Sequence, residues 1–198
     1  MAYTRDQAIA VHKDYQETVN NWEYYIRSYN GGYDYMVGQY LHRYNLELDN
    51  EFNQRLANTP CDNHCKNIIQ IYSSFLFRVR PSRDFGSLAD EPTINNFLKD
   101  ADLEGNNLNA VIKQAQNYAS IYGHCFLILD KPNVTTNTRA EELDQDIRPY
   151  LSIVTPENVF DWNYERQLNG KYELNYLKIR EEVDKKGGTY MRVWYPDR

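Results

Sequence analysis

Residues 106–132 read NNLNAVIKQAQNYASIYGHCFLILDKP, and this stretch decides the fold class. Apolar residues recur at helical spacing from Leu108 to Tyr122, after two asparagines that suit an N-cap, and Gly123 is a typical helix end. The run from Cys125 to Leu129 is apolar throughout but too short for a helix, so it predicts a buried central strand. A helix that turns at once into a strand therefore separates a helical part of the chain from a β-rich part.

The chain before this stretch favours helices. Apolar residues at spacings of three and four predict a long amphipathic helix from Thr4 to Tyr29, with Thr4 and Gln7 as a capping box and Gly31-Gly32 as its end. A tyrosine-rich hinge is expected at 33–44 and a loop at 82–91. Shorter helices are predicted at 48–56, at 62–77 and from Pro92.

The chain after this stretch favours strands. A short acidic helix is expected after the Asn/Thr loop at 133–138, and strands are predicted at 150–154, 159–164, 172–179 and 190–195. The last two flank 184–188, whose glycines suit a hairpin. We therefore expect an α+β domain with a helical region at 1–123 and a mainly antiparallel or mixed sheet at 124–198.

Composition limits the function classes. Lys and Arg number 22 against 28 Asp and Glu, and the resulting net charge of −6 argues against a protein that holds nucleic acid tightly. The chain has 18 tyrosines, which can pack a ring while the hydroxyl faces water or a partner. Eight of the 18 lie between Tyr15 and Tyr44, so this segment is expected to form a subunit interface or, alternatively, a half-buried wet core.

No apolar run approaches the roughly 18 residues of a membrane span, and the N-terminus is unlike a signal peptide. Three cysteines give no disulfide framework. We expect synthesis in a reducing intracellular compartment and no membrane partner.

Two clusters could bind a metal. Cys61, His64 and Cys65 supply three zinc-type ligands, but a fourth must come from far away in sequence, so we favour structural thiols that share a buried or half-buried helix face. The acidic residues Asp100, Asp102 and Glu104 are typical of the start of a calcium loop. No glutamate closes that loop, so a solvated turn is favoured.

Catalytic signatures are missing from the sequence. His124 and Cys125 would point to opposite faces of a strand, and no nucleophile elbow, zinc-protease helix or phosphate loop is present. We predict no catalytic residue, no metal site and no cofactor, and an enzyme that uses one of the two clusters is kept only as a remote alternative.

Arg78, Arg80 and Arg83 form the densest basic group, where a helix gives way to an extended segment. They could contact a phosphate backbone or pair with carboxylates of a neighbouring subunit. The acidic composition favours the second interpretation.

The sequence resembles the N-terminal, wing-region part of tailed-bacteriophage portal proteins from about Trp22 to Ile179. The resemblance is clearest where a helix ends in Tyr122-Gly123 and a strand finishes at Asp130 and Pro132. The other matching pieces, in order, are 22–32, 40–41, 51–57, 67–69 with 75–78, 97–98, 102–105, 107–108, 148–151 and 155–162. Each piece is weak alone, and their order and spacing carry the likeness.

The resemblance implies a homo-oligomeric ring, usually a dodecamer, at one vertex of the capsid, assembled in the host cytoplasm and retained in the virion. Viral genome packaging and ejection would pass double-stranded DNA through this head–tail connector, with terminase, capsid and tail or neck proteins as partners. The family has no ATPase of its own. Twelve chains of charge −6 carry −72 together, which suits weak, non-specific contact with moving DNA.

Family members are several hundred residues long, so the resemblance also implies that this chain continues beyond Arg198. The alternative is a phage neck or head-completion adaptor that binds a portal, and a stop codon after Arg198 would favour it. In either case the candidate interface residues are Tyr24, Tyr25, Tyr33, Tyr35, Tyr40, Arg78, Arg80 and Arg83.

Overall fold

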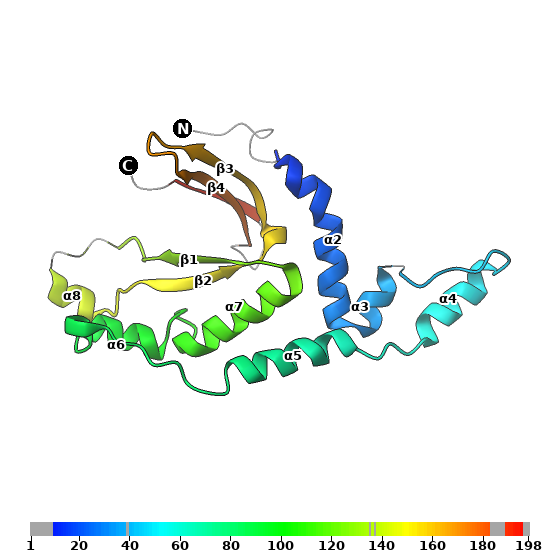
Figure 1. The fold of residues 1–198 in the computed structure, drawn as a ribbon, viewed down its shortest axis with the longest axis horizontal. Coiled ribbons are helices and arrows are strands. Elements are labelled where there is room, and N and C mark those ends of the chain that lie inside the picture. Colours follow the sequence, from blue (N-terminus) through cyan, green and yellow to red (C-terminus); the bar gives the residue numbers. More distant parts are fainter. Residues whose placement is uncertain (1–9, 39, 135, 137, 183–188, 196–198) are drawn as a thin grey trace. The chain divides into compact units, whose positions relative to one another are not determined.

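The computed structural model describes residues 10–38, 40–134, 136, 138–182 and 189–195. The chain forms two compact units, each of which contains helices and antiparallel strands, so the predicted α+β class is confirmed (Figure 1). Unit 1 takes the described residues of Met1–Ser28, Tyr33–Thr59 and Thr155–Arg198, and unit 2 takes those of Tyr29–Gly32 and Pro60–Val154. This division differs from a boundary at residues 123 and 124, because the β-rich part of the chain supplies a sheet to each unit.

Unit 1 is built on a three-stranded antiparallel sheet in the order β3-β4-β5. Its helices are most of α2 (Lys13–Asn30) and α3 (Gly32–Val37), followed by α4 (Asp49–Asn58) and the 3-10 turn η2 (Pro156–Asn158). Its strands are β3 (Val159–Arg166), β4 (Tyr172–Glu182) and β5 (Thr189–Trp194). The predicted pairing of the last two strands is confirmed, while their connection at 184–188 lies outside the described residues.

The central strand β4 carries the core of this sheet. Ile179 pairs with Val159 of β3, and both side chains are almost completely buried. Lys178 is buried too, but its Nζ donates to the carbonyl of Ala10 and lies 3.7 Å from Asp161 Oδ2, so the charge is compensated. A buried lysine with two oxygen partners explains how a charged residue occupies a central strand.

The long helix starts later than the sequence predicts. The proposed cap at Thr4 and Gln7 lies outside the described residues, and Ala10 to His12 are not helical. The His12 N–H donates to the carbonyl of Phe160 at 2.8 Å, and its ring stacks on Trp162 at 4.3 Å. Helical geometry at His12 would give up both contacts with β3, and these contacts favour an extended entry into α2.

The expected hinge at 33–44 is partly wrong, because its first residues form the helix α3. Beyond α3 the segment is irregular up to α4. There Arg55 of α4 makes two 2.7 Å hydrogen bonds to Glu47 and lies over the Tyr44 ring at 4.6 Å. These contacts hold the loop against α4, and the hydrogen bond from Arg55 lowers the pKa of the Glu47 carboxyl.

Unit 2 is arranged around the helix α7 (Leu108–Tyr122), which contacts α5, α6 and β2. Asn107 caps α7 by accepting from the Ala110 N–H at 3.0 Å, and Gly123 ends it with a left-handed φ of 88°. Both ends were predicted from the sequence. The other elements are α5 (His64–Leu76), η1 (Gly86–Leu88), α6 (Pro92–Lys99), β1 (Phe126–Asp130), α8 (Arg139–Asp144) and β2 (Tyr150–Val154).

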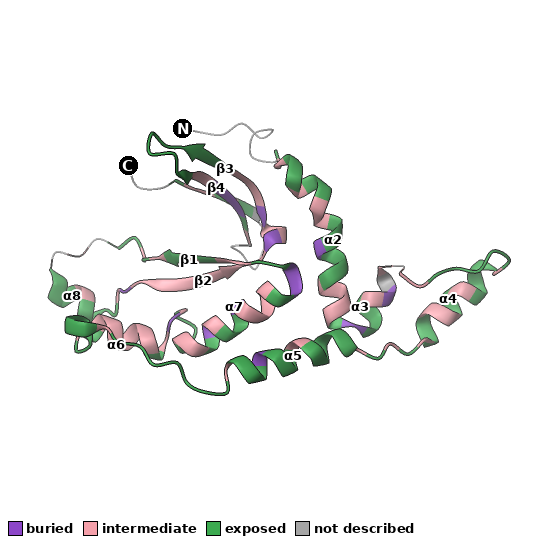
Figure 2. Cartoon of the chain, in the orientation of Figure 1, coloured by how far each residue is buried: buried purple, intermediate pink, exposed green. Residues whose placement is uncertain are grey.

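The strand after α7 is neither central nor fully buried, so that prediction is wrong. Among the described residues β1 has one partner, β2, with which it forms an antiparallel two-stranded sheet. Its burial alternates along the strand, and Leu127 and Leu129 are exposed (Figure 2). An unbroken apolar run signals a strand, but it does not reveal how many neighbours the strand has.

A buried arginine fixes the turn that leads into α7. Arg148 donates to Asp100 Oδ2 at 2.8 Å and to the Asp146 carboxylate at 3.1 Å, and it also donates to the Asp100 carbonyl. Next to it, the completely buried Ala101 accepts from the Leu151 N–H at 2.7 Å. The turn at 100–107 is therefore attached to β2 by both side-chain and backbone hydrogen bonds.

One asparagine joins the end of α2 to the start of α5. Asn63 Oδ1 accepts from the Lys66 N–H at 2.9 Å and so caps α5, while its Nδ2 donates to the carbonyl of Tyr29. Gly31 lies against this amide with a φ of 67°. A side chain at Gly31 would meet Asn63 Nδ2 at 2.6 Å, whereas one at Gly32 would meet nothing within 4 Å.

We expect Gly31→Ala to lower the free energy of unfolding by about 2–3 kcal/mol, because the strained φ costs about 1–2 kcal/mol and displacement of the Asn63 cap costs about 1 kcal/mol more. Gly32→Ala is the matched control, since its φ of 56° brings the same strain without the clash. Urea unfolding followed by circular dichroism measures both. Equal losses in the two variants would show that Asn63 contributes nothing to this junction.

Candidate interaction surfaces

Four of the five predicted interface tyrosines form one cluster in unit 1. The Tyr40 ring packs edge-on against Tyr24 with centroids 4.7 Å apart and lies 5.1 Å from Tyr35. Tyr24 is also 6.0 Å from Tyr25, its neighbour on α2. Helices α2 and α3 and the segment after them supply these rings, and Gly38 leaves room for Tyr40 because a side chain there would overlap the ring.

The cluster is only partly buried. Tyr24 and Tyr25 stay exposed on their outer faces, while Tyr35 and Tyr40 are half-buried. Tyr33 is outside the cluster and 81% exposed, on the opposite side of α3 by helical spacing. The four clustered tyrosines thus fill a small local core, and Tyr24 and Tyr25 also present ring surface to solvent, as Tyr33 does outside the cluster.

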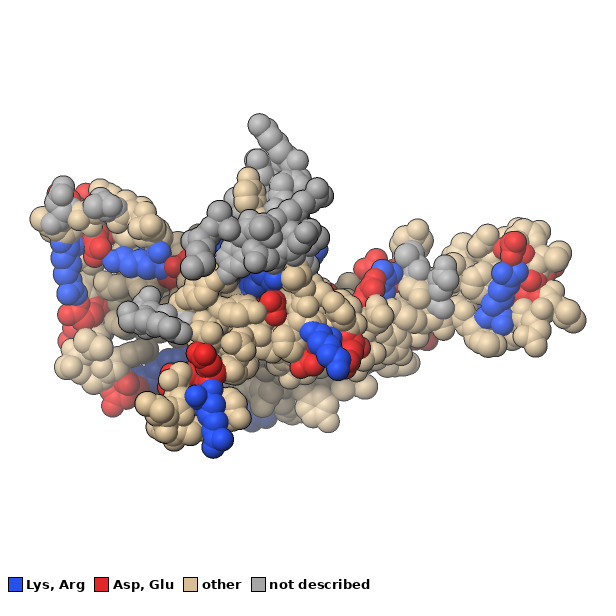
Figure 3. Space-filling model, turned by 90° about the horizontal axis from the view of Figure 1, so that it is seen from above, with Lys and Arg blue, Asp and Glu red and all other residues tan. Residues whose placement is uncertain are grey.

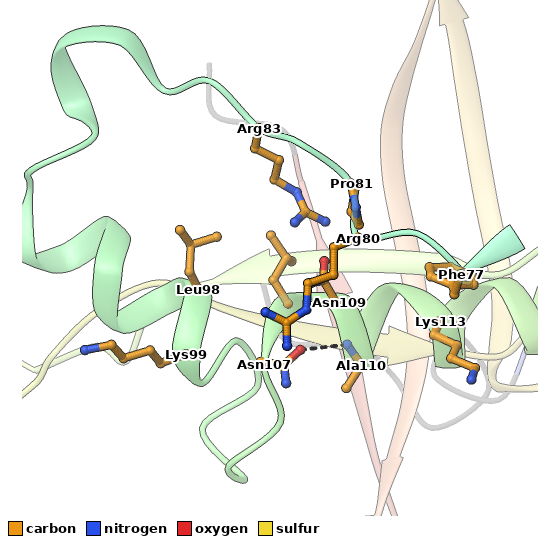
Figure 4. Close-up of a pocket in the computed structure, with 11 residues that line it drawn as sticks. Phe77, Arg80, Pro81, Arg83, Leu98, Lys99, Asn107, Asn109, Ala110 and Lys113 are labelled. Atoms are coloured by element: carbon orange, nitrogen blue, oxygen red, sulfur yellow. Dashed lines mark hydrogen bonds between the residues drawn. The ribbon is translucent and has the colours of Figure 1, made fainter. Parts of the chain in front are cut away.

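The structure separates the three predicted arginines. Arg80 and Arg83 line a cavity of about 740 Å³ in unit 2, and Arg78 does not. The cavity lies between the segment at 77–83, the end of α6 and the start of α7 (Figure 4). In the close-up the Arg80 guanidinium reaches toward Asn107 at the start of α7, and the Arg83 side chain extends from the 77–83 segment into the same space.

The walls of the cavity combine apolar and polar groups. Phe77, Leu98 and Leu108 supply apolar surface, and the first turn of α7 contributes Asn107 and Asn109. Lys99 and Lys113 lie at the rim and point outward (Figure 4). Neither Asp nor Glu lines the cavity, so its lining carries only positive charge.

An exposed apolar stripe on α5 is the feature that sequence reasoning missed. Its side chains lie at helical spacings of three and four residues, continue just past the end of the helix, and are 53–74% exposed: Ile68, Ile71, Tyr72, Phe75, Leu76 and Val79. Helix α5 also contacts α7, and Ser73, which lies outside the stripe, is its buried residue. The helical spacing of these apolar residues predicts a helix with an apolar stripe, but spacing alone does not tell whether the stripe faces the core or stays exposed.

The thiol cluster is not arranged as predicted. Cys61 precedes the Asn63 cap, so it is not on the helix and does not share a face with Cys65, and Cys65 is exposed. Within the described ranges, no group of three or more His, Cys, Asp or Glu side chains lies close enough to hold a metal ion. Cys125 donates to the Ala115 carbonyl at 3.2 Å, and burial raises the pKa of its thiol.

The acidic cluster forms a structural turn. Asp102 Oδ1 accepts from the N–H groups of Glu104 and Asn106, and Asp100 Oδ1 accepts from the Gly105 N–H. Burial alone would raise the pKa of the Asp102 carboxyl, but the Asn106 side chain and these backbone donors outweigh it and lower the pKa. The carboxylates are thus occupied in holding the turn.

Charged side chains of both signs are interspersed on the face drawn in Figure 3. Ion pairs between oppositely charged side chains include Arg27–Glu23 and Lys131–Glu142. None of the described helices has the length and apolar character that a membrane span requires.

No protein-family model matches the sequence, and none of the curated proteins matches it at a significant level. Function therefore has to be argued from the residues and their arrangement.

Proposed function

We propose that this chain is the wing-region part of a portal-type protein, which forms a ring at the capsid vertex for packaging and ejection of viral DNA. The observation that carries the proposal is the ordered series of portal-like motifs, above all the one at 122–132. In the structure this segment is a helix that ends at Tyr122, a left-handed Gly123, and a strand that finishes at Asp130.

The uncovered apolar surface supports a role in assembly. Each large apolar side chain that a partner removes from water contributes about 1.5–3 kcal/mol, and the stripe presents six of them, five on α5 and Val79 just beyond it. Aromatic residues are enriched at interfaces, and the stripe contains Tyr72 and Phe75. A neighbouring copy in a ring would cover such a surface. In unit 1, Tyr24, Tyr25 and Tyr33 are separate candidates for a subunit contact.

The proposed ring gives the acidic composition a role. A channel protein has to let DNA slide, and each phosphate that it neutralises adds affinity and therefore drag. A chain with net charge −6 holds DNA weakly. Terminase, capsid and tail or neck proteins would bind the outside of this ring.

The test is the assembly state of the full-length product. Electron microscopy and native mass measurement should show a ring with a central hole. A compact monomer at micromolar concentration would contradict the proposal. A small complex formed only with a separate portal would instead support the neck or adaptor function.

We expect Phe75→Asp to raise the concentration needed for assembly at least about tenfold, because a charge would be buried in an apolar contact. Ser74→Asp is the matched control, since Ser74 is exposed on the same helix but lies outside the stripe. Light scattering over a concentration series measures both variants. If Phe75→Asp assembles at the same concentration as the wild type, the stripe is not part of the subunit interface.

A further inference from the structure

The basic cavity of unit 2 has the properties of an anion site, and we propose that it binds the phosphate group of a small molecule. Its volume of about 740 Å³ lies within the range of roughly 300–1,000 Å³ that is usual for small-molecule pockets. Phe77, Leu98 and Leu108 would contact the apolar body of the ligand. This inference does not depend on the proposed ring.

The arginines of the cavity have no counter-charge. Among the residues that the structure describes, Arg80 and Arg83 make no ion pair or hydrogen bond. Because guanidinium groups bind phosphate oxygens in a two-pronged geometry, two of them facing one space form a clamp for a tetrahedral anion. The rim residues Lys99 and Lys113 add positive charge without a partner of their own in the described chain.

The nearby carboxylates are turned to other partners. Asp84, beside Arg83, accepts from the Gly86 N–H at 2.8 Å. Asp100, beside Lys99, pairs with Arg148 at 2.8 Å. The Asp100 charge is therefore balanced by Arg148, and the described contacts of Asp84 include no ion pair with Arg80 or Arg83.

The start of α7 adds neutral donors on the same side. Within the helix the N–H groups of Leu108 and Asn109 have no acceptor, since the Asn107 side chain takes the Ala110 N–H and its carbonyl takes that of Val111. The Asn109 side chain, which lines the cavity, has a buried Oδ1 with no hydrogen-bond partner in the structure. Because Oδ1 is an acceptor, it could bind only a protonated phosphate oxygen or a hydroxyl of the ligand, while the arginines bind the charged oxygens.

Phosphate suits this donor set better than a carboxylate does. A phosphate dianion offers three or four acceptor oxygens in different directions, whereas a carboxylate offers two in one plane. Arg80 and Arg83 come from the extended segment after α5, while the cavity residues Leu108 and Asn109 belong to the first turn of α7, so the donors come from two separate parts of the chain. Helix N-termini with added basic side chains are a recurrent phosphate-binding arrangement.

The experiment titrates inorganic phosphate and a nucleoside monophosphate into the full chain at constant ionic strength, with isothermal calorimetry as the readout. We expect saturable binding by the wild type. Arg80→Ala with Arg83→Ala should weaken it about a hundredfold, which is tenfold for each charge-assisted contact. Both arginines are exposed, so the double variant should keep its fold, and circular dichroism checks this.

Arg78→Ala is the control, because Arg78 is an exposed neighbour that does not line the cavity. The phosphate affinity of this variant should stay within about twofold of the wild-type value. Absence of saturable phosphate binding, or an equal loss in Arg78→Ala, would overturn the proposal. Equally tight binding of a glutamate-rich peptide would assign the cavity to a protein carboxylate instead. Binding of duplex DNA that inorganic phosphate does not compete for would assign it to a nucleic-acid backbone.

Discussion

Trp22→Ala is expected to lower the free energy of unfolding by about 3–5 kcal/mol, the usual cost of removing a large buried aromatic side chain. Trp22 is 7% exposed and is the buried residue of α2. Its ring meets Tyr15 edge-on at 5.8 Å, and Tyr15 meets Phe160 of β3 in the same way at 5.1 Å. The tryptophan therefore anchors a chain of rings that holds α2 against the sheet of unit 1.

The Tyr15 hydroxyl strengthens this chain by donating to the Glu157 carbonyl at 2.9 Å. Burial raises the pKa of that hydroxyl, and the nearby Arg180 opposes the shift. Loss of Trp22 would leave the Tyr15 ring beside a cavity. Urea unfolding followed by far-ultraviolet circular dichroism measures the change.

Tyr33→Ala is the control for Trp22→Ala, because it also removes a large ring, but from a side chain that is 81% exposed. It should change stability by less than about 0.5 kcal/mol. If Trp22→Ala melts as the wild type does, the packing of α2 described above is wrong.

Arg148→Ala is expected to lower the free energy of unfolding by about 3–5 kcal/mol, because it leaves polar partners of a buried cation without their hydrogen bonds. The Arg148 side chain is 4% exposed and binds two carboxylates and one carbonyl. The turn at 100–107 would lose its side-chain attachment and keep only the backbone bond from Leu151 to Ala101, and the first turn of α7 follows directly from it. Thermal and urea unfolding of the purified variant measure the effect.

Arg139→Ala is the control for Arg148→Ala, because it separates the effect of burial on stability from the effect of losing a charge. Arg139 also makes a 2.8 Å ion pair, with Glu91, but its side chain is 71% exposed. Solvent screens such a pair, so its loss should cost less than about 1 kcal/mol. Similar losses in the two arginine variants would mean that burial is not what makes Arg148 important.

The parts of the fold that were predicted correctly depend on local chemistry. Asn107 and Gly123 mark the ends of α7 because a cap and a left-handed residue are properties of a few neighbouring atoms. The pairing of β4 with β5 likewise follows from two adjacent strand patterns. These signals are complete within a short window of sequence.

The parts that were missed depend on distant partners. The apolar run at 125–129 gives no indication that β1 has one neighbour instead of two. His12 leaves the helical pattern because of a hydrogen bond to Phe160, which is 148 positions away in the chain. The exposed side of α5 and the convergence of Arg80 with the start of α7 are also set by packing that periodicity does not encode.

The double role of Asn63 has a consequence for cooperativity. A single amide satisfies a donor at the start of α5 and the Tyr29 acceptor at the end of α2. Fraying of either helix end would leave the Asn63 hydrogen-bonding partner at the other helix end unsatisfied. The two ends therefore open together as one local unfolding event. Segments that are 34 positions apart in the chain thereby exchange their amide protons through a common opening step.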